Sequence, residues 1–242
     1  MNKMDITIKK TTTITNETEW FLVAPPKKGI IQWKDGYSAK EFAKFATLNG
    51  NLQKLLQSIL EEISFITDDS FIGEPEFETK LPGQGEGRNH DLLLYNKDLV
   101  IGIEAKVDEV FGETIKKEYY DKDVTENKKN RIKELKRIVF RNPDSQDVDE
   151  LRYQLLTATA GTLLEAFEKD KEQCVFLVLS FHKFNKEVNS DNKAAFKSFV
   201  EIVCGKNKKS QIFTVNGKEI TCWFLEREIS FTPETFKISQ EY

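Results

Sequence analysis

The chain has 242 residues, of which 39% are hydrophobic and 31% are charged, and its formal net charge is −4 at pH 7. This composition is typical of a water-exposed domain with its own core. No apolar run reaches the roughly 18 residues of a membrane-spanning helix, so we expect no membrane partner. The negative charge argues against a dedicated non-specific nucleic-acid binder, because such proteins gain affinity by neutralising phosphates.

The N-terminal segment and the cysteines indicate the compartment. Residues 1–20 contain neither an apolar segment nor a small-residue cleavage site, so we expect no secretory signal. Cys174, Cys204 and Cys222 are odd in number and lie far apart in apolar contexts. This pattern predicts buried free thiols in a reducing, cytoplasmic environment. The cysteine and histidine spacings are not those of a zinc site or a catalytic triad.

The first half of the chain predicts two helices before a hairpin. Residues 1–37 suggest irregular or short-strand structure. Ser38 followed by Glu41 has the spacing of a capping box, which predicts a helix with Ser38 as its N-cap. Leucines and isoleucines recur at helical spacing over residues 52–63 and predict a second helix. A strand near residues 75–80 should then lead through a glycine-rich loop into the hairpin.

The second half contains a charged stretch and then regular elements. Residues 108–150 are polar, so we expect an insertion with one or two helices. Residues 151–170 and 191–204 have helical patterns, and residues 174–181 form an apolar run typical of a buried strand. Asn216-Gly217 between two apolar segments is a strong hairpin signal.

The order of helix, three strands, helix and strand predicts an α/β fold, with a mixed central sheet flanked by helices. We expect a single domain over residues 1–242 with additions at both ends. Its expected parts are an N-terminal extension (1–37), the first helices and hairpin (38–107), a polar insertion (108–150), and a second core helix, strand and C-terminal hairpin (151–242).

The segment LVIGIEAKV, residues 99–107, is an apolar strand that ends in charged residues. Side chains alternate between the two faces of a strand, so Glu104 and Lys106 share a face with Gly102. A two-residue hairpin loop would pair Asp91 with Gly102, and a four-residue loop would pair it with Glu104. Both registers put Asp91 on the face of Glu104 and Lys106, whereas a three-residue loop would reverse it.

Two carboxylates and an ammonium group at one sheet edge have a chemical use. Carboxylate oxygens are ligands for hard cations such as Mg²⁺, which polarise a phosphoryl oxygen and activate water. Lys106 would position that water or stabilise developing negative charge. The alternative is a solvated Glu–Lys pair of little energetic consequence.

Asp91 followed by Glu104-Ala105-Lys106 resembles the motif of the PD-(D/E)xK nuclease superfamily, which has the restriction-endonuclease-like fold. The stretches APPKKGIIQWKDGYSAKEFA, EAKVDEVFG and RYQLLTATAGTLLEA look like a bacterial branch of it, and the matches span roughly residues 20–182. His90 stands where the superfamily's name has a proline. The resemblance implies that Mg²⁺, or Mn²⁺ in its place, is held by Asp91, Glu104 and the Ala105 carbonyl, with Lys106 acting in phosphodiester hydrolysis.

Further polar residues are candidates for the same site. Gln154, near the start of the long helix, could reach the Lys106 region, and a capping or solvent-facing role is the alternative. Arg88 could meet a phosphate. The basic segment 128–141 has the charge of a nucleic-acid contact, although a solvated helix face also explains it. Its candidate contacts are Lys128, Lys129 and Arg131.

Two functions therefore compete. The first is a metal-dependent nuclease whose expected substrate is DNA, with RNA, the mode of cleavage and a homodimeric state left open. The second is a catalytically inert nuclease-fold module that serves binding or assembly. Whether Glu41, Glu109 or His90 joins the site is also left open.

Overall fold

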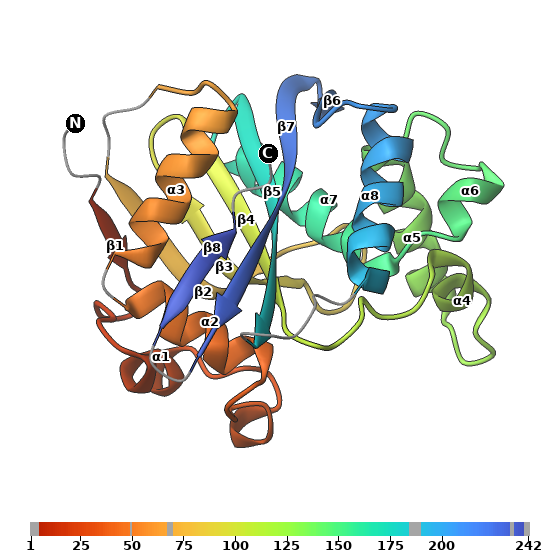
Figure 1. Ribbon diagram of the computed structural model, residues 1–242. Coiled ribbons are helices and arrows are strands. Elements are labelled where there is room, and N and C mark those ends of the chain that lie inside the picture. Colours follow the sequence, from red (N-terminus) through yellow and green to blue (C-terminus); the bar gives the residue numbers. More distant parts are fainter. Residues whose placement is uncertain (1–4, 49, 67–69, 184–189, 233–234, 240–242) are drawn as a thin grey trace.

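The computed structural model describes residues 5–48, 50–66, 70–183, 190–232 and 235–239. Within them, a mixed sheet of eight strands organises the chain (Figure 1). The order is β1-β2-β3-β4-β5-β7-β6, and β8 pairs with β7. The strands are β1 (Ile6–Ile8), β2 (Phe71–Thr79), β3 (Arg88–Tyr95), β4 (Leu99–Lys106), β5 (Gln173–Lys183), β6 (Ser210–Val215), β7 (Lys218–Phe231) and β8 (Phe236–Ser239).

The sheet is antiparallel from β2 to β4 and parallel from β4 through β5 to β7. Helices cover both faces (Figure 1). They are α1 (Glu17–Val23), the 3-10 turn η1 (Gly29–Ile31), α2 (Ser38–Thr47), α3 (Asn51–Glu62), α4 (Ile115–Tyr120), α5 (Glu126–Val139), α6 (Gln146–Asp149), α7 (Tyr153–Glu168) and α8 (Ser190–Cys204). The predicted mixed α/β class is therefore confirmed.

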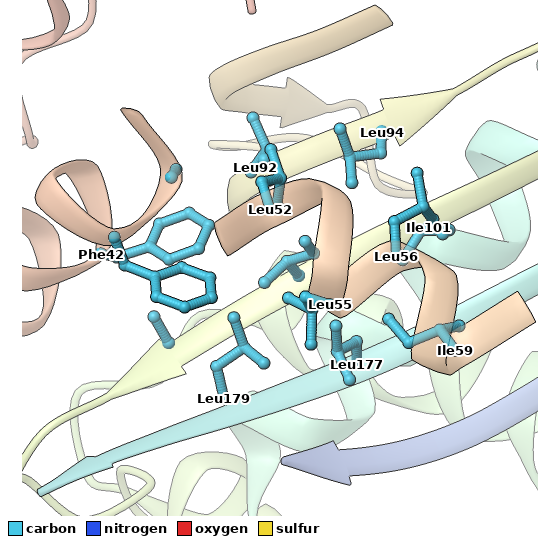
Figure 2. Packing of buried hydrophobic residues seen from close by; sticks show 14 of the residues in the cluster. Phe42, Leu52, Leu55, Leu56, Ile59, Leu92, Leu94, Ile101, Leu177 and Leu179 are labelled. Carbon is cyan, nitrogen blue, oxygen red and sulfur yellow. The ribbon is translucent and has the colours of Figure 1, made fainter. Parts of the chain in front are cut away.

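The first core layer lies between α2, α3 and one face of the sheet. Figure 2 shows the helical residues over side chains of β3, β4 and β5. The α3 residues follow the i, i+3, i+4, i+7 spacing of one helical face, and every second strand residue faces them. The labelled side chains are Phe42, Leu52, Leu55, Leu56, Ile59, Leu92, Leu94, Ile101, Leu177 and Leu179.

The opposite face of the sheet packs against α5, α7 and α8. Leu93, Val100 and Phe176 alternate with the residues of the first layer and belong to this second cluster. Segment 108–150 contributes to the same cluster and contains three helices, α4, α5 and α6, where one or two were expected. Its assignment as an insertion stays a prediction. Its charged residues point outward, while apolar side chains at helical spacing are buried below them. The buried residues are Phe111, Ile115, Ile132, Leu135, Val139 and Val148.

The N-terminal segment is more regular than predicted. It contains α1, and β1 pairs in parallel with β2. The expected capping box is wrong, because the N-cap of α2 is Tyr37 rather than Ser38. The Glu41 carboxylate instead accepts a hydrogen bond from the backbone N–H of Gly36 at 2.7 Å. The Ser38–Glu41 spacing fits a capping box, but the N-cap position of the helix lies one residue before Ser38.

The C-terminal hairpin and the state of the cysteines agree with the sequence predictions. The β6–β7 hairpin turns at Asn216 and Gly217, whose φ angles of 48° and 84° are those of a type I′ turn. All three cysteines are free and buried. In the part of the chain that the structure describes, no helix is both long and apolar enough to cross a bilayer.

Close packing of α7 on the sheet depends on small residues. A Cβ added to Gly102 of β4 would lie 2.2 Å from Thr162 Oγ1 and 3.0 Å from His90 Nδ1. A Cβ at Gly161 of α7 would lie 3.0 Å from His90 Nε2. The two glycines therefore let the His90 ring fit between strand and helix.

We predict that Gly102→Ala lowers the free energy of unfolding by about 1–3 kcal/mol, because the added methyl group overpacks the α7 contact. Urea denaturation measures this change. Gly112→Ala is the matched control, because nothing lies within 4 Å of a Cβ added there. Equal stability of the two variants would contradict the packing described for α7.

Candidate active site

The β3–β4 register brings Asp91 to the face of Glu104. Tyr95 pairs with Val100 and Leu92 with Ile103, which is the register expected for a four-residue loop. Asp91 follows one step beyond, opposite Glu104. There the Asp91 Oδ2 accepts a hydrogen bond from the backbone N–H of Ala105 at 2.6 Å. The Asp91 side chain thus accepts a backbone N–H of β4 just beyond the last backbone pair of the two strands.

A cavity of about 960 Å³ opens at this position. It is lined by Asp91, Glu104, Ala105 and Lys106 of the hairpin and by Gln154 of α7. Its other walls come from Arg88 and Asn89 of β3, from acidic residues of β2 and from the N-terminal segment around Pro25. All the residues predicted for the catalytic set therefore border one cavity.

Glu104 is the most enclosed charged residue of the site, at 4% exposure. Its Oε1 accepts from Lys106 Nζ at 2.9 Å and from Gln154 Nε2 at 2.6 Å. Its Oε2 accepts from the guanidinium of Arg88. Burial acts to raise the pKa of Glu104, but Arg88 and Lys106 outweigh it and hold that pKa below its ordinary value. The carboxylate is therefore ionised, with donors on both oxygens.

Lys106 stays charged in the same environment. Burial acts to lower its pKa, but the carboxylates of Glu104 and Asp91 outweigh this and raise it. Its Nζ also lies 5.7 Å from the centre of the Phe111 ring, within range of a cation–π contact. The lysine is a hydrogen-bond donor and electrostatic group here, and not a base.

Asp91 differs from Glu104 in its protonation. Burial and the nearby Glu104 charge raise the pKa of Asp91 to about 7. The site thus holds one carboxylate that is firmly ionised and one carboxyl group that is about half protonated near pH 7. This pairing is frequent where carboxyl groups have separate chemical roles.

Glu76 of β2 is a site residue that sequence reasoning missed. It lies between Pro75 and Phe77, which pair with Leu92 and His90, so it stands opposite Asp91. Burial and the Asp91 charge raise its pKa to about 8. Its φ of 46° is rare for a non-glycine residue. The alternation of Glu74, Glu76 and Glu78 in this strand was the available signal.

The three open candidates lie in different environments. Glu109 lines the cavity and accepts from the N–H of Val107 at 3.2 Å. Glu41 binds the Gly36 backbone, as described above, and is not among the lining residues. His90 is buried and contacts Thr79 Oγ1 at 3.1 Å. Burial and then Arg88 lower the pKa of His90 to about 3, so the ring is neutral and structural.

The basic segment lies beside a second cavity of about 460 Å³. Arg131 of α5 donates to the carbonyls of Pro82, Gln84 and Glu86, so it organises the glycine-rich loop before β3. Lys128 pairs with Glu118, and Lys129 lies 5.9 Å from the Tyr119 ring centre. A role for Lys128, Lys129 and Arg131 in nucleic-acid binding stays a prediction.

Asp91 and Glu104 supply oxygen ligands, which are the type that hard cations prefer. The site offers few such ligands, however. Among the described residues, no group of three or more His, Cys, Asp or Glu side chains is arranged to hold a metal ion. A divalent cation would therefore have to complete its shell with oxygens from water and substrate.

The fold and site define a mixed α/β protein with a recessed carboxylate–lysine centre. The family model described as a domain of unknown function (DUF6946) matches residues 12–228. The chain belongs to that family. No curated protein and no solved structure matches the chain. The matched range includes every residue of the site described above.

The raised pKa values of Asp91 and Glu76 predict a pH dependence of stability. The folded protein keeps protons on Asp91 and Glu76 up to about pH 7 and 8, whereas the unfolded chain loses them near the ordinary values of 3.8 and 4.5. Because the folded state then binds more protons, stability falls as pH rises through this window. His90 is buried in its neutral form, so its contribution to stability increases as pH rises. This opposes the loss from the carboxyl groups only below the ordinary His90 pKa of 6.5.

We therefore predict that the metal-free protein loses thermal stability between about pH 5 and 8, most steeply above pH 6.5, where His90 no longer opposes the trend, and that Asp91→Asn flattens the part of this decline below about pH 7. Asparagine keeps an oxygen for the Ala105 N–H but has no proton to lose. Melting temperatures across the pH series test this. Asp123→Asn, in the exposed turn after α4, is the control. The same slope in wild type and Asp91→Asn would contradict the assignment.

Proposed function

We propose that the chain is a metal-dependent nuclease that hydrolyses phosphodiester bonds, with DNA as the expected substrate. The observation that carries the proposal is the convergence of Asp91, Glu104 and Lys106 in one cavity. The strand order β2-β3-β4-β5 with α7 between β4 and β5 supports a restriction-endonuclease-like core. This order is the one that the PD-(D/E)xK resemblance implies.

Each residue has a role that follows from its contacts. Asp91, Glu104 and the Ala105 carbonyl would hold Mg²⁺, or Mn²⁺ in its place. When bound, the cation would supply a Lewis acid for the phosphoryl oxygen and lower the pKa of a water. Lys106 donates from a fixed ammonium group and would stabilise negative charge developing on the phosphate. Gln154 orients Glu104 through its 2.6 Å hydrogen bond.

A specific observation also favours the inert binding module. Both oxygens of Glu104 already have donors from Arg88, Lys106 and Gln154. A buried carboxylate satisfied in this way is compatible with a purely structural ion network. The two functions differ in one respect, since only the nuclease needs a cation to displace part of this network.

We predict that Lys106→Met reduces hydrolysis by about 10²-fold or more, because it removes one charged donor from the reacting phosphate. The assay is cleavage of single- and double-stranded DNA and RNA with Mg²⁺ or Mn²⁺. Lys206→Met, in an exposed turn after α8, is the matched control and should cleave like wild type. Undiminished cleavage by a folded Lys106→Met protein would refute the nuclease assignment to this cavity.

A further inference from the structure

Arg88 stands between the two cavities. It lines the larger cavity, where its guanidinium binds Glu104, and it also lines the smaller cavity beside α5. Its backbone is fixed, because Arg88 pairs with Thr79 of β2 and the preceding Gly87 N–H donates to Glu78 at 2.8 Å. A change of partner at Arg88 therefore needs only a rotation of its side chain.

The present position of the guanidinium is in conflict with a cation on Glu104. Arg88 holds Oε2, while Lys106 and Gln154 hold Oε1. A divalent cation bound to this carboxylate would share it with a guanidinium, and like charges at such short range repel strongly inside a protein. Lys106 is bound on the other oxygen and Gln154 is neutral, so Arg88 is the donor that must leave.

Arg88 is also incompletely satisfied where it lies. Its Nε is buried and has no hydrogen-bond partner among the described residues. Its stem is confined by α7, since Arg88 Cγ lies 3.5 Å from the position of a Cβ at Gly161. A buried donor without a partner is unfavourable. The smaller cavity, of about 460 Å³, offers space on the other side of the same residue.

We propose that Arg88 is a phosphate-binding residue that blocks the metal position on Glu104 until substrate arrives. The inference rests on the nuclease proposal and deepens it. A nucleic-acid phosphate accepts the guanidinium through two parallel N–H donors, which is the geometry that arginine offers best. Glu104 is then free for the cation. Metal and phosphate binding thereby become reciprocally coupled through a single side chain.

The test is titration calorimetry with Ca²⁺ on the full chain, without substrate. Arg88→Met removes the guanidinium but keeps a stem of similar length, so we expect it to bind Ca²⁺ about 5- to 150-fold more tightly than wild type, the usual range of such a coupling. Adding a short DNA duplex should tighten Ca²⁺ binding to both proteins, because phosphate oxygens add ligands, but more strongly to wild type, where the phosphate also draws Arg88 away from Glu104.

Arg227→Met is the matched control, because Arg227 pairs with Glu62 at the end of α3 and does not line either cavity. It loses the same charge and should keep the wild-type affinity. If Arg88→Met does not fold, Arg88→Gln replaces it, since glutamine keeps a neutral donor for Glu104.

Two results would overturn the inference, and they differ in what else they refute. Equal Ca²⁺ affinity of wild type and Arg88→Met would remove the blocking role of Arg88 and leave the nuclease proposal intact. No Ca²⁺ binding by any variant, with or without DNA, would refute both.

Discussion

The burial of the Glu104 carboxylate is the constraint on which the site depends. A carboxylate in the interior of a protein is strongly unfavourable unless charges and hydrogen bonds compensate it. Here the compensation comes from three separate elements, with Arg88 on β3, Lys106 on β4 and Gln154 on α7. The carboxylate therefore links the hairpin to the helix that crosses behind it.

Small residues make this linkage possible. Gly102 and Gly161 bring α7 close enough for Gln154, in the first turn of the helix, to reach a strand residue. The same close approach encloses His90 in a neutral form. Packing and electrostatics are thus coupled, because a looser α7 would both open the core and leave Glu104 without one of its donors.

The alternation of side chains along the strands predicted the part of the site that depends on which face of the sheet each residue occupies. Alternation along residues 99–107 put Asp91, Glu104 and Lys106 on one face for a hairpin loop of two or four residues, and the observed register is that of the four-residue loop. The Arg88–Glu104 pair was not predicted, because it joins the beginning of one strand to the end of the next and needs the register of the whole hairpin. Glu76 was missed because its position opposite Asp91 depends on the pairing of β2 with β3.

The fold shows the same division between local and long-range information. The helices at 52–63 and 151–170 and the Asn216-Gly217 hairpin follow from spacing and turn chemistry, which are local. The burial of segment 108–150 does not, because its few apolar residues are diluted by charges and become core only when α5 packs on α7. A charged composition alone therefore does not show that a segment lies outside the core.

The ionic network around Glu104 is compatible with a resting nuclease and with an inert module, and the two differ in whether a cation binds at Glu104 when metal and substrate are added. A crystal structure with Mn²⁺ and a DNA oligonucleotide, analysed by anomalous scattering at the manganese edge, tests this most directly. The nuclease account predicts an anomalous peak between Asp91 and Glu104, and the proposed role of Arg88 places its guanidinium on a phosphate. No peak in the cavity, with Arg88 still bound to Glu104 beside ordered DNA, would contradict it.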